Sequence, residues 1–165
     1  MKPFLGCLAA LIAVLVLMLI MGVVIGVGGY NQLTRLSQAV DTQWAQVQNV
    51  YQRRADLIPN LVSTVSGAAN FEKSTLTEVT NARASVGKVQ VSPNAAPSDP
   101  QKLREFEAAQ GSLTSALSRL LVVVERYPEL KANANFQALQ AQLEGTENRI
   151  AVERGRFNET VQNFN

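Results

Sequence analysis

The side chains in this sequence that could do chemistry are mainly carboxylates. Glu144 and Glu147, and likewise Glu125 and Glu129, are three or four residues apart, so each pair shares one face of a helix. Such a pair could act as a general acid and base, or it could bind a hard cation. The alternative is an ordinary solvated helix face, and this is the interpretation that we favour.

Other catalytic and cofactor chemistry has little support in the composition. The chain has no histidine, its single cysteine is Cys7, and its methionines all lie in the apolar N-terminal segment. Di-iron sites in helical proteins use Glu-x-x-His pairs, and haem uses His or Met ligands. The chain also has no glycine-rich phosphate loop and no basic block. We therefore expect a protein that is not an enzyme, with no cofactor, no metal and no nucleic-acid partner.

An uncharged run extends from Phe4 to Tyr30, with Lys2 before it and Arg35 as the first charge after it. About 27 residues at ~1.5 Å each make a helix of roughly 40 Å, which can cross a ~30 Å hydrocarbon core with some tilt. A cleavable signal peptide has a shorter apolar core, so we favour a retained anchor. The sequence predicts contact with membrane lipid through residues 4–30 and two units, an anchor at 1–30 and a domain at 31–165.

Small residues within the anchor suggest how two spans could meet. Gly22 and Gly26 are four residues apart and share a helix face, where a neighbouring span can approach closely. The alternative is that glycine is simply frequent in membrane helices. The positive charges flanking the span, Lys2 and Arg35, are balanced, so the side of the membrane that carries the domain stays open.

The domain shows the apolar spacing of three and four residues that is typical of amphipathic helices. No stretch alternates with period two over the length of a strand. Because each apolar stripe has polar residues opposite it, we expect the helices to lie against one another around a shared core. The sequence predicts an all-α chain, with an N-terminal transmembrane helix followed by an up-and-down, antiparallel four-helix bundle of long helices. The expected helices are residues 31–54, 57–88, 100–126 and 134–164, with a loop at 89–99.

Prolines suggest where the helices end. Asp99 can cap the third helix with Pro100 at its first position, and Pro128 ends that helix. Pro59 allows two interpretations. If Asp56 is an N-cap, Pro59 lies in the first turn of a new helix, where proline is tolerated. The competing interpretation is one long helix kinked at Pro59; we favour the break.

With a break near Asp56, two turns of the bundle meet at the end farthest from the membrane. These turns, residues 53–60 and 127–135, would form a tip that could recognise a partner, although helix capping and packing explain the same residues. An unbroken first helix would separate the two turns. The candidate tip residues are Arg53, Arg54, Asp56, Pro59, Asn60, Tyr127, Pro128, Glu129, Lys131 and Asn133.

Three segments resemble the signature of the bacterial LemA family. They are residues 52–62 (QRRADLIPNLV), 127–133 (YPELKAN) and 143–151 (LEGTENRIA), and their order after a single span also matches. The resemblance implies a membrane-anchored four-helix bundle without known enzymatic activity, in the bacterial cytoplasmic membrane. Family members usually continue into an aromatic, proline-containing tail. This sequence ends at Asn165, so nothing residing in that tail carries over.

Three functions fit these features. The first is a homo-oligomeric scaffold, in which spans associate through Gly22 and Gly26 and amide-rich domain faces pack side by side to organise or shape the membrane. The weakly charged surface favours it, because packing such faces desolvates few charges. The second is a monomeric adaptor that presents its tip to another envelope protein. The third is a sensory module, which we rank last because no second span or output domain is seen.

Overall fold

All the regular structure in the described residues is helical, and no strand occurs among them. The computed structural model describes residues 2–68, 71–89, 91–93 and 95–164, with residues 2–13 as backbone only. An all-helical chain with a long apolar helix at its N-terminus is therefore the fold class. The helices are α1 (Lys2–Ser66), α2 (Lys73–Lys88), α3 (Pro100–Val124), α4 (Pro128–Lys131) and α5 (Ala134–Phe164).

Helix α1 corrects the expected break near Asp56. It runs without interruption for 65 residues and contains Pro59 in its interior. At ~1.5 Å per residue this helix is about 97 Å long. The chain turns back only after Ser66, 12 residues after the predicted end of the first helix at residue 54, and α2 begins at Lys73.

A side chain from α2 explains why the helix continues through Pro59. Proline has no N–H, so the carbonyl of Ala55, four residues earlier, loses its helical donor. Arg83 replaces that donor: its Nε lies 3.0 Å from the Ala55 oxygen. The pyrrolidine ring itself points outward, because Pro59 is exposed. The residues around Pro59 carry no signal for a donor that lies 24 residues further along the chain.

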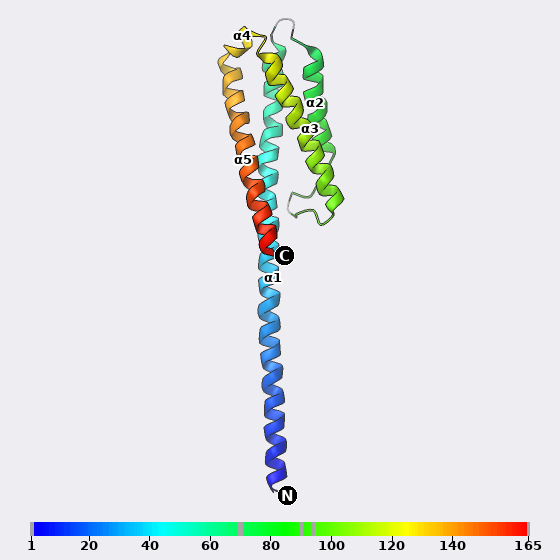
Figure 1. The fold of residues 1–165 in the computed structure, drawn as a ribbon, viewed down its shortest axis with the longest axis vertical. Coiled ribbons are helices and arrows are strands. Elements are labelled where there is room, and N and C mark those ends of the chain that lie inside the picture. The colour runs from blue at the N-terminus through cyan, green and yellow to red at the C-terminus, as the bar shows by residue number, and fades with distance from the viewer. Residues whose placement is uncertain (1, 69–70, 90, 94, 165) are drawn as a thin grey trace.

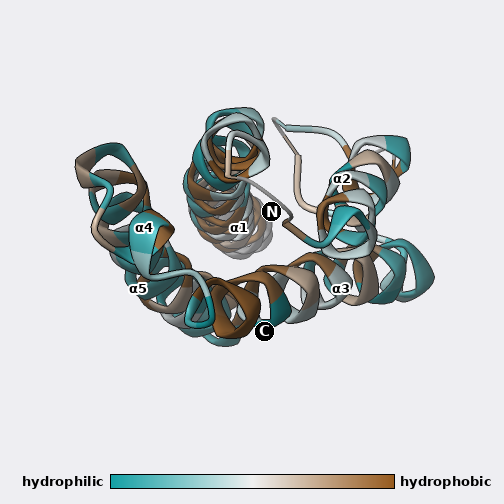
Figure 2. Ribbon diagram, turned by 90° about the horizontal axis from the view of Figure 1, so that it is seen from above, coloured by the Kyte–Doolittle hydropathy of each residue, from teal (hydrophilic) through white to brown (hydrophobic). Residues whose placement is uncertain are grey.

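The long helices run alternately away from and toward the N-terminal end of the molecule. In Figure 1 the chain rises along α1, descends along α2, rises along α3 and descends along α5, with the short α4 at the far end. Backbone contacts are most extensive between α1 and α5 and between α2 and α3, and α1 also contacts α2. Seen along the long axis, these helices surround a shared interior (Figure 2).

Apolar side chains fill that interior in two groups. The distal cluster, farther from the N-terminus, includes Leu61, Val79, Leu113 and Leu120, none of which has any exposed surface. The proximal cluster contains Trp44, Val47, Tyr51, Phe106 and Ile150. Burying each large apolar side chain stabilises the fold by about 1.5–3 kcal/mol, so these clusters supply most of the packing energy.

Aromatic rings join three helices in the proximal cluster. Trp44 on α1 contacts Phe106 on α3 and Phe157 on α5, with ring centroids 5.5 Å and 5.3 Å apart. The indole Nε1 of Trp44 also donates to the carbonyl of Ser92 at 2.9 Å, which ties the connection between α2 and α3 to α1. At the end of that connection, Asp99 caps α3 as predicted, accepting from the backbone N–H of Gln101 at 2.8 Å.

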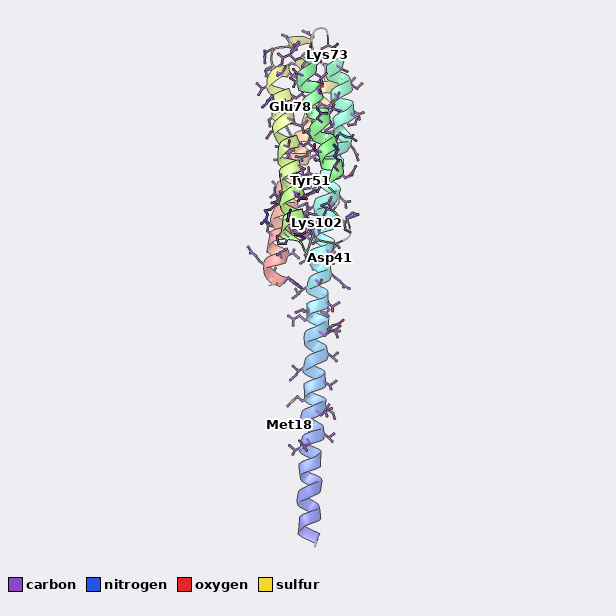
Figure 3. All side chains as sticks on the ribbon, turned by 90° about the vertical axis from the view of Figure 1, so that its right-hand side faces the viewer. Met18, Asp41, Tyr51, Lys73, Glu78 and Lys102 are labelled. Atoms are coloured by element: carbon purple, nitrogen blue, oxygen red, sulfur yellow. The ribbon has the colours of Figure 1, made fainter. Side chains whose placement is uncertain are left out.

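The N-terminal part of α1 stands apart from the packed helices. The side chains from Val14 to Ile25 are all largely exposed, and from Val14 onward, where burial is described, the first buried residue of α1 is Trp44. Figure 3 shows Met18 projecting from this isolated stretch, far from Tyr51 in the packed region. The most apolar part of the helix has a mean hydropathy of 2.2, and among the described residues it is the one helix apolar and long enough to cross a membrane. This is compatible with a single-pass membrane protein.

Candidate functional site

A charged side chain separates the two apolar clusters. Arg54 on α1 is 1% exposed, although it belongs to the segment that the sequence analysis placed at a turn. Trp44, Val47 and Tyr51 precede it on the buried face of α1, and Ile58 follows it one turn later. The position is therefore a core position by helical spacing, occupied by an arginine.

Arg54 bonds to α3 and α5 at once. Its Nη1 donates to Thr114 Oγ1 at 2.7 Å and to Glu147 Oε1 at 2.6 Å. Its Nη2 donates to the backbone oxygen of Gln110 at 3.3 Å and also bonds to the Gln110 side-chain oxygen. We call Arg54, Gln110, Thr114 and Glu147 the polar layer. It joins three helices through one guanidinium group.

The electrostatics of the polar layer depend on Glu147. This is the acidic group bonded to Arg54, and its side chain is 38% exposed while that of Arg54 is 1% exposed. The ring of Tyr51 lies 5.2 Å from the guanidinium carbon and gives a further favourable contact. The Arg54 Nε is buried without a hydrogen-bond partner. A buried charge with one ionic partner is costly to leave unpaired, so this layer constrains how the helices align.

Tyr51 connects the polar layer to the proximal cluster. Burial raises the pKa of its phenol, and the neighbouring Arg154 and Arg54 partly offset that effect. Its ring packs edge-on against Phe106 at 5.2 Å between centroids. Arg154, which lowers the pKa of this phenol, pairs with Glu107 at 2.7 Å.

The expected meeting of the two turns does not occur, because α1 is unbroken. Arg53 and Asp56 lie exposed along the side of α1, where Asp56 accepts from Gln52 at 2.8 Å. Pro59 and Asn60 are also exposed and stand within the helix. Together with the burial of Arg54, this places residues 53–60 along the body of the domain. The structure therefore supports the alternative in which an unbroken first helix separates residues 53–60 from residues 127–135.

The far end is instead formed by residues 71–72 and 125–133. The rings of Phe71 and Tyr127 are 4.9 Å apart, and Arg126 pairs with Glu72 at 3.3 Å. The helix expected at residues 57–88 is therefore wrong at this bend, where Gly67 beside Ser66 is a turn signal in the sequence.

The second predicted tip segment lies at this end and has structural contacts. Pro128 is the first residue of α4, and Lys131 Nζ lies 2.6 Å from Glu125 Oε2. Asn133 caps α5, because its Oδ1 accepts from the backbone N–H of Asn135 at 2.9 Å. Glu129 is exposed on α4. Capping and packing therefore explain most of this segment.

The carboxylate pairs do not form a combined acid–base site. Glu144 accepts from Gln140 at 3.0 Å, whereas Glu147 is turned toward Arg54. Glu125 is bonded to Lys131. Among the described residues, no group of three or more His, Cys, Asp or Glu side chains is placed to hold a metal ion.

The anchor glycines have open surroundings. A Cβ added at Gly22 or Gly26 would meet no atom within 4 Å, and the same is true at Gly29. At 100° per residue these three glycines fall within about 60° of one another, so they form one smooth strip on the free part of α1. The strip leaves room for close approach by another helix.

A groove between α3 and α5 is the feature that sequence reasoning missed altogether. It has a volume of about 470 Å³, with Leu117, Leu121 and Leu143 as its apolar wall. Glu144 and Glu147 border it from α5. Only the distance between two helices creates such a groove, and spacing within one helix gives no signal for it.

The fold and the site define an all-helical protein with two parts. One is an apolar N-terminal helix that is compatible with a membrane span, and the other is a packed domain centred on a buried arginine. The chain belongs to the LemA family, because the LemA family model matches residues 43–165. It is also 24% identical over 139 residues to the protein LemA of Metamycoplasma hominis. That match covers 84% of this chain and 59% of the relative, so the chain spans somewhat over half the length of that protein.

Proposed function

We propose that this chain is a non-enzymatic, membrane-anchored helical-bundle protein that associates with copies of itself to organise or shape a bacterial cytoplasmic membrane. The observation that carries the proposal is the continuity of α1. One helix of 65 residues contains both the glycine strip and the Arg54 position of the packed domain. Contacts between spans therefore fix the orientation of whole domains, which is what a scaffold needs.

The composition of the domain surface supports the same function. In residues 31–165 charged residues make up 20%, somewhat below the ~25% usual for soluble domains, and amide and hydroxyl side chains take their place. Several of the exposed charges are already paired within one copy, such as Arg119 with Glu78 at 2.9 Å. Side-by-side packing of such faces would desolvate few unpaired charges. The LemA family is not a known family of enzymes, which agrees with a structural role.

The adaptor alternative is less favoured by this geometry. Its proposed surface needs residues 53–60 and 127–133 at one end, and α1 places the first of these along the domain side with Arg54 buried. A reduced tip around Tyr127, Glu129 and Lys131 would remain available for a partner.

The test is the particle mass of the full-length protein in mild detergent over a range of concentrations. The Gly22→Ile/Gly26→Ile variant adds side chains on the glycine strip, where nothing in one copy obstructs them. Gly28→Ile is the matched control, because it adds the same side chain about 120° away around the helix. We expect a discrete assembly that the double variant weakens and the control preserves. A monomer at every concentration would contradict the proposal.

A further inference from the structure

The side of the domain between α3 and α5 is open. The close backbone contacts of the domain join α1 with α5, α2 with α3 and α1 with α2, whereas α3 and α5 are joined mainly through side chains. The ion pair of Glu107 with Arg154 spans them at 2.7 Å toward the proximal end. At the distal end the short α4 connects them. The groove of about 470 Å³ lies between these two closures.

The wall of the groove is apolar, and its border is acidic. Leu117, Leu121 and Leu143 line it, with no lysine or arginine among the lining residues. Val122, one turn along α3 from Ser118, is 67% exposed and extends the apolar surface outward. Leu117 and Leu143 are 6% and 4% exposed, so they form the floor of the groove, and Leu121 and Val122 supply its accessible apolar rim. An apolar rim of this kind, bordered by polar groups, is typical of an interaction site.

The two carboxylates at the border keep acceptor capacity. Glu144 uses Oε1 to accept from Gln140, and Glu147 uses Oε1 to accept from Arg54. The second oxygen of each carboxylate can accept from an arriving cation. The charge of Glu147 is already paired with Arg54, whereas Glu144 is bonded to the neutral amide of Gln140. Glu144 is therefore the charge at this border that can pair with a basic group on a helix laid against the leucines.

We propose that this groove binds an amphipathic helix of another protein, one whose leucine-type stripe is flanked by lysine or arginine. Helices commonly dock in this way, with an apolar face in an apolar groove and charged residues at its border. Charge complementarity selects this occupant over a second copy, since two α3–α5 faces would bring acidic borders together. The proposal does not depend on self-association through the glycine strip.

Two synthetic peptides test the proposal. Both are 18-residue helices with one leucine stripe, and the flanking positions are all lysine in one and all glutamate in the other. Fluorescence anisotropy measures their binding to the full-length protein in phosphatidylcholine nanodiscs at low salt, with empty nanodiscs as the background. Glu144→Lys changes the groove, and Glu78→Lys makes the same charge change on an exposed pair between α2 and α3. Ser118→Trp fills the groove from an exposed position without changing the charge.

We expect the lysine peptide to bind wild-type protein and the Glu78→Lys variant with affinities within about twofold of each other. Glu144→Lys should weaken this peptide about five- to tenfold and favour the glutamate peptide, and Ser118→Trp should abolish binding of both. If Glu144→Lys and Glu78→Lys weakened binding of the lysine peptide equally, the peptide would be attracted only by net charge, and the proposal would be overturned. It would also be overturned if the peptide bound the protein-containing nanodiscs no more strongly than empty ones. Conversion of an oligomer to a monomer by Ser118→Trp would identify a second copy as the occupant.

Discussion

Removing the charge of Glu147 should destabilise the domain more than removing Arg54 itself. Glu147→Gln keeps a similar shape but leaves the guanidinium of Arg54, 1% exposed, with neutral partners. Breaking a buried ion pair from one side costs about 3–5 kcal/mol. Glu147 is 38% exposed, so water weakens the pair, and we expect a loss of about 2–3 kcal/mol. Arg54→Met removes the buried charge, leaves a hydrated carboxylate, and should cost about 1–2 kcal/mol.

The single tryptophan makes the measurement specific to the packed domain. Trp44 is 2% exposed in the proximal cluster, so its fluorescence during urea unfolding reports the domain and not the anchor. Glu78→Gln, in an exposed pair with Arg119, is the matched control and should cost less than about 0.5 kcal/mol. The Arg54→Met/Glu147→Gln double variant should be more stable than the Glu147 variant alone. If Glu147→Gln and Glu78→Gln had equal effects, Arg54 would not depend on Glu147.

Two further perturbations test other contacts of α1. Arg83→Leu removes the donor to the Ala55 carbonyl and should lower the stability of the wild-type chain by about 1 kcal/mol. In a Pro59→Ala chain the new backbone N–H restores that bond, so the same substitution should have almost no effect. If urea unfolding showed that the effects of the two substitutions add, this explanation would be contradicted. Tyr51 has a raised pKa because burial favours its neutral form, so the folded state holds the proton to higher pH than the unfolded state, and stability should fall as pH rises above about 10. Tyr51→Phe should remove that part of the pH dependence, and an unchanged slope would refute it.

How much the sequence predicts depends on whether a feature is local. The long apolar helix at the N-terminus, the Asp99 cap and the start of α3 at Pro100 follow from neighbouring residues, because capping and spacing act within one or two turns. The continuity of α1 does not, because it needs Arg83 from another helix to bond the carbonyl that Pro59 leaves free. The local rule for proline predicts that the helix breaks near Pro59, and the hydrogen bond from Arg83 allows it to continue.

The candidate site shows the same division. Helical spacing places position 54 on the buried face of α1, but an arginine at that position favours a surface prediction, because isolated arginines are rarely buried. Its partners Gln110, Thr114 and Glu147 are 56 to 93 residues away in the sequence. Only the packing of α1 against α3 and α5 brings these groups together, so the polar layer could be recognised from the structure alone.

The continuity of α1 also limits how two copies can associate through the glycine strip. At 100° per residue, Gly22 and Gly26 lie on the same side of α1 as Trp44 and Ile58, which face the packed helices. Spans that meet along this strip therefore direct both domains toward each other. A domain two helices thick needs about 20 Å, whereas packed helix axes are about 8–10 Å apart. Parallel spans would make the domains collide.

The crossing angle of the spans decides whether the domains fit. Position 53 lies about 41 Å above the middle of the strip at ~1.5 Å per residue. A right-handed crossing of about 40° separates the two helices by about 30 Å at that height, and a left-handed crossing of about 20° separates them by about 16 Å. We therefore expect the right-handed crossing. The α1 axes of the two copies should then be about 30 Å apart at position 53. Spin labels on exposed Arg53→Cys in a Cys7→Ser background measure this axis separation once the reach of each label from its helix is subtracted. An axis separation near 16 Å would contradict a meeting along the glycine strip, because the two domains would then overlap.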